Sequence, residues 1–222
     1  MHRIALPDWA VERGSHSNRF TAIDPRRTAL VVIDMQTVFM APGEAFANPH
    51  AMDIIAPVNR LAGAMRGAGG AVIWTRQTVS DAPPLAMPSW QYDLSIPHVR
   101  RAVDTMRPGT ASHALHPAMA VEPGDTVLDK YRYSPFLCPA NALRTELVAR
   151  DIAMLVIAGT LTNVCCESAV RDGNMIGYQV IMVSDATAAV TDEEHNAALL
   201  NVRLNFADIR TTVGVCSLLP SA

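Results

Sequence analysis

The sequence contains little cysteine, with four residues among 222 and no spacing typical of a disulfide framework. It has no run of lysine or arginine, and its formal net charge of −3 argues against a nucleic acid or an anionic membrane as a partner. No apolar stretch approaches the length of a membrane-spanning helix, and residues 1–20 lack the apolar core of a signal peptide. These absences predict a cytoplasmic protein with reduced thiols.

What the sequence does contain is the composition of one compact globular domain. Half of the residues are apolar and 18% are charged. A chain of this length builds one well-covered core and is short for two full domains. Residues 1–26 are polar and lack periodicity, so we expect an N-terminal arm that lies on the surface or on a neighbouring subunit. Residues 27–222 are expected to form the domain.

Short apolar runs alternate with segments of helical periodicity along this domain. Strands are expected at residues 28–34, 71–75, 126–130, 153–159, 178–186 and 209–215. Helices are expected at residues 49–70, 140–151, 163–177 and 191–207, the last with Thr191 and Glu194 in capping-box positions. Such alternation predicts an α/β fold with a mostly parallel six-stranded sheet between two helical layers.

One segment departs from this alternation. Residues 77–122 carry six prolines and little periodicity. They are therefore expected to form a long excursion with short helices at most. Loops of this length in compact domains are often functional.

Polar residues follow several of the expected strands, and ligands bind beyond the carboxyl ends of parallel strands. Asp34 follows the first strand and Lys130 ends the third, while Cys165 and Cys166 lie in the first turn of the helix after the fourth. A helix N-terminus can lower the pKa of a thiol. An acid, a lysine and a cysteine at one sheet edge could activate a nucleophile. Each also has a structural alternative, since such residues cap loops, remain solvated or pack inertly.

Three segments resemble the isochorismatase-like cysteine hydrolases, a family that includes ureidoacrylate, biuret and N-carbamoylsarcosine amidohydrolases and nicotinamidases. They are "ALVVIDMQTVF" (29–39), "GDTVLDKYRYSPF" (124–136) and the segment 156–189, which contains "GTLTNVCCESAVRDG". The resemblance runs from about residue 26 to residue 215. It implies a three-layer α/β/α fold and a homodimer or homotetramer.

The same resemblance implies a catalytic triad. By motif position, Asp34 would be the general base, Lys130 the triad lysine and Cys165 the nucleophile, because Cys165 ends the T-x-x-C frame at 162–165. Cys166 would be a packed neighbour. The family also places a cis peptide before this frame, at Thr160–Leu161, and an oxyanion hole made by the N–H groups of Leu161 and Cys165.

Two differences between this sequence and those of other family members restrict the reaction that the resemblance implies. Nicotinamidases carry an Asp-x-His metal set where this chain reads "TRQTVSD" (75–81), so neither a metal nor another cofactor is expected. Members that cleave a vinyl ether lack the nucleophilic cysteine. Its presence therefore implies hydrolysis of a C–N bond in a small amide, ureido or carbamoyl substrate, with release of ammonia or an amine.

Two alternatives stay open at this point. The fold could serve a non-catalytic protein that binds a small molecule, although the intact acid, lysine and cysteine argue against it. The pair Cys165–Cys166 could instead be a redox switch. A disulfide between adjacent cysteines closes a distorted ring that suits the first turn of a helix poorly.

Aromatic and polar residues next to the motifs are candidates for the substrate pocket, since ligand pockets are mostly apolar with a few polar groups. These candidates are Phe39, Trp74, Gln77, Tyr131 and Tyr133. Ordinary packing is an alternative for each of them. Within the proline-rich excursion, Trp90 and Tyr92 could form a lid or a subunit contact.

Overall fold

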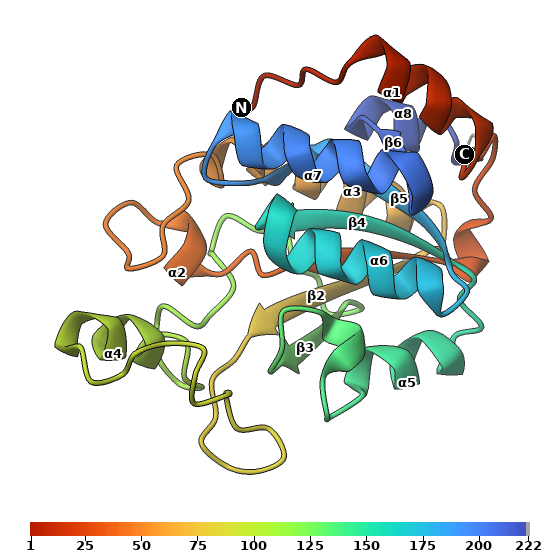
Figure 1. Cartoon of the computed structure of the whole chain (residues 1–222). Coiled ribbons are helices and arrows are strands. Elements are labelled where there is room, and N and C mark those ends of the chain that lie inside the picture. The colour runs from red at the N-terminus through yellow and green to blue at the C-terminus, as the bar shows by residue number, and fades with distance from the viewer. Residues whose placement is uncertain (221–222) are drawn as a thin grey trace.

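A sheet of six parallel strands forms the centre of the protein, whose computed structural model describes residues 1–220. The strand order is β3-β2-β1-β4-β5-β6 (Figure 1). The strands are β1 (Thr28–Ile33), β2 (Ala71–Gln77), β3 (Thr126–Lys130), β4 (Met154–Thr160), β5 (Gln179–Ala188) and β6 (Asp208–Arg210). The order reverses between β1 and β4, the point at which parallel sheets bind ligands.

Helices cover both faces of this sheet (Figure 1). The α-helices are α1 (Asp8–Arg13), α2 (Thr37–Met40), α3 (Ile55–Gly67), α4 (Pro97–Asp104), α5 (Ala142–Ala149), α6 (Glu167–Met175), α7 (Asp192–Asn205) and α8 (Thr212–Cys216). Shorter turns are η1 (Gly14–His16), η2 (Pro25–Arg27), η3 (Met52–Ile54), η4 (Pro135–Leu137) and the π-helical η5 (Thr162–Cys166). None of the described helices is long and apolar enough to span a membrane.

The alternation of side chains along β1 explains the three layers. Leu30 and Val32 enter the core beneath α3 and α8, whereas Ala29, Val31 and Ile33 enter the core beneath α5, α6 and α7. Both faces of β1 are therefore buried, which is why its sequence is a continuous apolar run. The predicted α/β/α fold with a parallel six-stranded sheet is confirmed.

Gly159 permits the close approach of β4 to β1. Its φ is +112°, a region that favours glycine, and a Cβ atom there would lie 2.1 Å from the carbonyl oxygen of Ile33. Only glycine fits such a contact between two backbones. This close approach draws the ends of the two central strands together.

The prediction of a strand over 209–215 is wrong beyond Arg210, where β6 ends. The residues that follow form α8, because the side chain of Thr211 accepts a hydrogen bond from the N–H of Gly214 and caps the helix. Asp185, at the end of the expected fifth strand, accepts hydrogen bonds from the N–H and the hydroxyl of Thr212. Local capping thus overrides the strand propensity of the β-branched residues.

The capping box predicted at the start of α7 is present. Thr191 accepts a hydrogen bond from the backbone N–H of Glu194, and the Glu194 carboxylate accepts one from the N–H of Thr191. The segment expected as an arm, residues 1–26, contains α1 and lies along α7 of the same chain. Asn196 and Arg203 of α7 both bond to it.

Candidate active site

Three side chains from different elements meet at the carboxyl edge of the sheet. The Lys130 Nζ atom lies 2.7 Å from Asp34 Oδ2 and 3.4 Å from Cys165 Sγ. Asp34, Lys130 and Cys165 are 1%, 2% and 7% exposed. Lys130 therefore contacts both of the other residues that the sequence nominated as a triad, with its ammonium group between the carboxylate and the thiol.

Neighbouring side chains fix the first two groups. Asp34 follows β1 with a left-handed φ of 51°, and its Oδ1 accepts a hydrogen bond of 2.8 Å from the Thr75 hydroxyl. Lys130 ends β3 and donates to Gln77 Oε1 at 2.5 Å and to the carbonyl oxygen of Arg132 at 3.2 Å. The ammonium group thus has four partners, which hold it in place within a buried site.

The turn that carries the cysteine follows β4. The peptide between Thr160 and Leu161 is cis, at the position expected from the resemblance. The turn η5 begins at Thr162, and the N–H of Cys166 donates to the carbonyl oxygen of Leu161 at 3.1 Å. Cys165 therefore sits in a π-helical turn rather than in the regular helix that the sequence predicted.

Side chains from remote elements hold the start of this turn. Asn48 donates to the Thr160 hydroxyl at 3.0 Å, and that hydroxyl donates to the carbonyl oxygen of Ala188 at 3.2 Å. The Thr162 hydroxyl lies 2.9 Å from Nδ1 of His195, which is fully buried in α7. Burial lowers the pKa of His195 to about 4, so its imidazole is neutral near pH 7.

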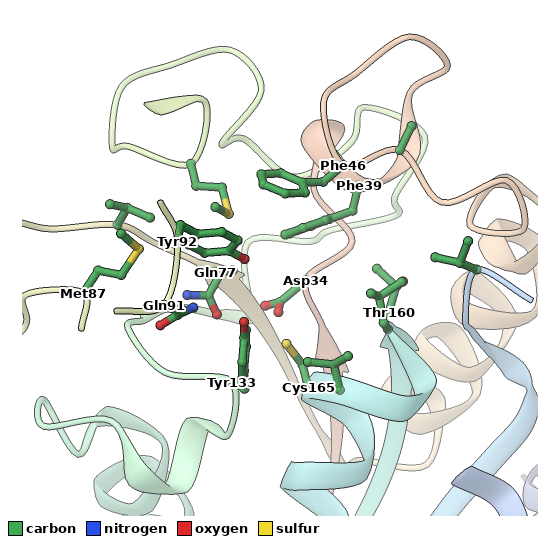
Figure 2. Close-up of a pocket in the computed structure, with 16 residues that line it drawn as sticks. Asp34, Phe39, Phe46, Gln77, Met87, Gln91, Tyr92, Tyr133, Thr160 and Cys165 are labelled. Atoms are coloured by element: carbon green, nitrogen blue, oxygen red, sulfur yellow. The ribbon is translucent and has the colours of Figure 1, made fainter. Parts of the chain in front are cut away.

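A cavity of about 280 Å³ opens in front of Asp34 and Cys165 (Figure 2). Three aromatic residues form one side of it: Phe39 of α2, Phe46 and Tyr92. The ring centroid of Phe46 lies 6.3 Å from that of Phe39 and 6.0 Å from that of Tyr92. The other lining residues are Ala47, Gln77, Val79, Met87, Gln91, Met106, Tyr133, Thr160, Leu161, Val164 and Val190. The thiol and the carboxylate thus face a pocket that suits a small molecule.

A family model described as the isochorismatase domain matches residues 28–213, which include all of the sheet. The chain belongs to the isochorismatase family. The family resemblance read from the motifs is therefore confirmed.

Curated and structural relatives of this family member share most of its length. Ureidoacrylate amidohydrolase RutB of Methylobacterium radiotolerans is 33% identical over 220 residues, with 90% of this chain and 84% of that protein covered. A cysteine hydrolase from Pseudomonas syringae pv. phaseolicola superposes with a TM-score of 0.79 at 30% identity, covering 90% and 95% of the two chains. N-carbamoylsarcosine amidase from Thermoplasma acidophilum shares the fold, with a TM-score of 0.67, 24% identity and coverage of 84% and 96%.

The electrostatics of this family member place the thiol in its protonated form at rest. The pKa of Cys165 is raised to about 12; burial is the largest cause, the Lys130 charge opposes it, and the Asp34 charge adds to it. Burial lowers the pKa of Lys130, but the charges of Asp34 and Cys165 outweigh it and the net shift is upward. The expected lowering of the thiol pKa by a helix N-terminus is not found, because desolvation is the larger effect.

The two adjacent cysteines have different surroundings. Cys165 lines the cavity, whereas Cys166 is fully buried in the core beneath α6 and does not line it. Burial, followed by the charge of Cys165, raises the pKa of Cys166 well above its usual value. Both thiols are free. Cys166 therefore occupies the packing position that was expected of it.

The pocket residues nominated from the sequence divide into two groups. Phe39, Gln77 and Tyr133 line the cavity. Trp74 does not, because it packs in the core beneath α3 and its indole N–H donates to Asp125 at 2.8 Å. Since alternate residues of a strand point to opposite faces, Trp74 cannot share the face of Gln77.

Tyr131 also lies outside the cavity lining. It follows β3 directly, and burial, with the nearby charge of Asp129 next in effect, raises the pKa of its phenol. Tyr133, two residues further along, reaches the cavity instead. Pocket residues that sequence reasoning missed, such as Phe46, Met87 and Gln91, belong to loops without periodicity.

A cluster of two histidines and an aspartate that could bind a metal lies outside the cavity. Ligand atoms of His2, His50 and Asp192 lie within 4.8 Å of one another, outside the cavity lining. Nε2 of His2 accepts the N–H of Ala189 at 3.0 Å, which assigns the ring proton to Nδ1, and Nδ1 donates to Asp192 at 2.8 Å. A metal ion on His2 would have to displace this proton, so the cluster is already satisfied without one.

Proposed function

We propose that this chain hydrolyses the C–N bond of a small amide, ureido or carbamoyl compound through a thioester on Cys165, and releases ammonia or an amine. The chain is a hydrolase acting on C–N bonds other than peptide bonds. One observation supports the proposed thioester mechanism. The buried ammonium group of Lys130 contacts both the Asp34 carboxylate and the Cys165 thiol at the edge of a cavity.

In the first step, Asp34 accepts the thiol proton while the sulfur attacks the carbonyl carbon of the substrate. A thiol whose pKa is raised to about 12 is almost entirely protonated near pH 7, so a base must remove the proton as the bond forms. The Lys130 ammonium stabilises the negative charge that develops on sulfur, from 3.4 Å away. Positioned charges of this kind act strongly in a site that excludes water.

The carbonyl oxygen of the substrate gains negative charge in this step. The backbone N–H groups of Leu161 and Cys165 would bind it, and a single donor of this kind contributes about 3 kcal/mol to transition-state stability. Protonated Asp34 then gives its proton to the departing nitrogen, which leaves a thioester. Asp34 next accepts a proton from a water molecule that attacks the thioester, and the acid product leaves with Cys165 restored.

Ammonia release from a panel of primary amides, ureas and carbamoyl compounds tests this proposal. We expect turnover of at least one class and its loss in Cys165→Ala. Cys166→Ala is the matched control, because Cys166 lies next in the chain but outside the cavity lining, and it should retain turnover. Full activity of Cys165→Ala would show that the nucleophile lies elsewhere.

A further inference from the structure

The cavity wall contains no cationic side chain. Among the described residues that line it there is no arginine, lysine or histidine, and Asp34 is the charged member of the set. Lys130 lies beside the cavity, but its ammonium group is already paired with Asp34. A ligand in this cavity therefore meets one negative charge and no free positive charge.

Most of the wall is apolar. Val79 and Met106 are buried in one hydrophobic cluster, and Phe39, Phe46 and Met87 pack against it. We call these five residues the apolar wall. All five line the cavity, and Figure 2 shows Phe39, Phe46 and Met87 across it from Cys165. Apolar surface of this kind binds alkyl or aryl groups by excluding water.

The remaining polar groups of the cavity are neutral. Gln77 uses its Oε1 atom to accept from Lys130, which leaves the amide NH₂ as its donor. Gln91, Tyr92 and Tyr133 complete the polar side (Figure 2). Burial and the neighbouring phenol of Tyr133 raise the pKa of Tyr92, so it remains an uncharged hydroxyl. These groups can orient a neutral polar ligand.

The guanidinium of Arg132 lies in an adjoining groove with Trp90 and Leu137. Its N–H groups donate to the carbonyl oxygen of Tyr131 at 2.6 Å and, more weakly, to those of Leu85 and Pro84. It therefore braces the loop outside the cavity rather than facing the reacting groups.

We propose that the substrate is an uncharged amide or urea with an alkyl or aryl substituent, and that compounds bearing a free carboxylate, such as ureido acids, are rejected. This inference rests on the proposed function. A carboxylate placed in the cavity would lose its hydration without gaining a cation, and it would lie near Asp34. An alkyl or aryl group in the same place would bury apolar surface against the apolar wall.

Matched pairs of ligands test the proposal. Hexanamide is compared with adipamate, and propylurea with 3-ureidopropanoate, so that the two members of each pair differ only in a methyl or carboxylate end. Binding is measured by calorimetry on Cys165→Ala, and kcat/KM is measured on the unmodified protein by ammonia release. We expect the uncharged member of each pair to be favoured by about 100-fold or more.

The two measurements separate the proposals. Equal or better binding of the carboxylates, or no binding of either uncharged ligand, would overturn the inference. Preferential binding of the uncharged ligands without any turnover would support the inference while contradicting the proposed hydrolysis. If the unmodified protein prefers the carboxylates and Arg132→Met no longer binds them, Arg132 is the cation that pairs with the carboxylate, and the inference is wrong.

A charge added to the wall gives an independent check. Gln91 is half-buried and lines both the cavity and the adjoining groove, so a longer side chain can be placed there. Gln91→Arg should improve binding of adipamate by about tenfold or more, whereas the matched Gln91→Met should not. Equal effects of the two variants would show that charge is not what excludes the carboxylate.

Discussion

The carboxylate of Asp34 has two opposite effects on the reactivity of Cys165, and two assays on Asp34→Asn would separate them. In the proposed mechanism it accepts the thiol proton as a base, and its negative charge raises the pKa of the thiol. The variant loses both actions but keeps the Lys130 ammonium 3.4 Å from the sulfur. We therefore expect an enzyme that turns over poorly and yet carries a more reactive cysteine.

The size of the effect follows from the geometry. A unit charge 3.4 Å from the sulfur interacts with a thiolate by about 5 kcal/mol at an effective dielectric constant of about 20. That energy corresponds to roughly three to four pKa units. Asp34 offsets much of this stabilisation in the unmodified protein. Its removal should lower the pKa of Cys165 by on the order of two units, which raises the thiolate fraction near neutral pH about 100-fold.

The assay is the rate of alkylation by iodoacetamide, followed at Cys165 by peptide mass spectrometry. Cys166 is an internal control because it is fully buried. Ammonia release is measured in parallel and should fall by about 10²- to 10⁴-fold, the usual contribution of a general base. Asp129→Asn is the matched variant, since Asp129 neighbours Lys130 but pairs with Arg76 at 2.7 Å outside the cavity lining.

Two results would refute this reasoning. If Asp34→Asn is alkylated no faster than the unmodified protein, the charge of the carboxylate does not control the thiol. If the same variant keeps its turnover, Asp34 is not the proton acceptor. A comparable change in Asp129→Asn would point to a general loss of structure instead.

Three further variants test the scaffold. Gly159→Ala should lower the free energy of unfolding by more than about 3 kcal/mol, because the new Cβ atom would lie 2.1 Å from the Ile33 oxygen. Denaturant titration measures this loss, and a loss below about 1 kcal/mol would contradict the close approach of the two strands. Thr191→Ala should cost about 1 kcal/mol through the lost bond to the Glu194 N–H, and an unchanged midpoint would contradict the cap. The pKa of His195 is about 4 in the folded protein, so below about pH 6.5 the unfolded chain binds a proton that the folded protein does not. The free energy of unfolding should therefore fall by up to roughly 3 kcal/mol between about pH 6.5 and pH 4. His195→Gln should flatten this dependence of the free energy of unfolding on pH, and an unchanged dependence would assign it to another group.

The sheet and the meeting of Asp34, Lys130 and Cys165 at its edge were predictable from the sequence because both depend on short-range patterns. Continuous apolar runs mark strands buried on both faces, and a parallel sheet brings strand ends to one edge. Asp34 and Lys130 could therefore be placed together from their positions after β1 and in β3. The family motif then separated Cys165 from Cys166, which periodicity alone could not do.

The cavity was less predictable because its walls are loops. Phe46 and Met87 come from segments without periodicity, and their positions depend on how the long excursion packs against α2. Trp74 was nominated for its residue type although its place in β2 sets it on the opposite face from Gln77. The alternation of side chains along β2 would have excluded Trp74 from the pocket candidates.

The apolar wall and the reacting groups are built from different parts of the chain. Asp34, Lys130 and Cys165 stand at the ends of sheet strands or just beyond them, whereas all five wall residues lie in α2 or in loops, outside the regular strands. A mutational library over residues 44–47 and 85–92 would thus sample new ligands without altering Asp34, Lys130 or Cys165. In evolutionary terms, descendants of one such protein can change the compound they consume while inheriting an unaltered reaction.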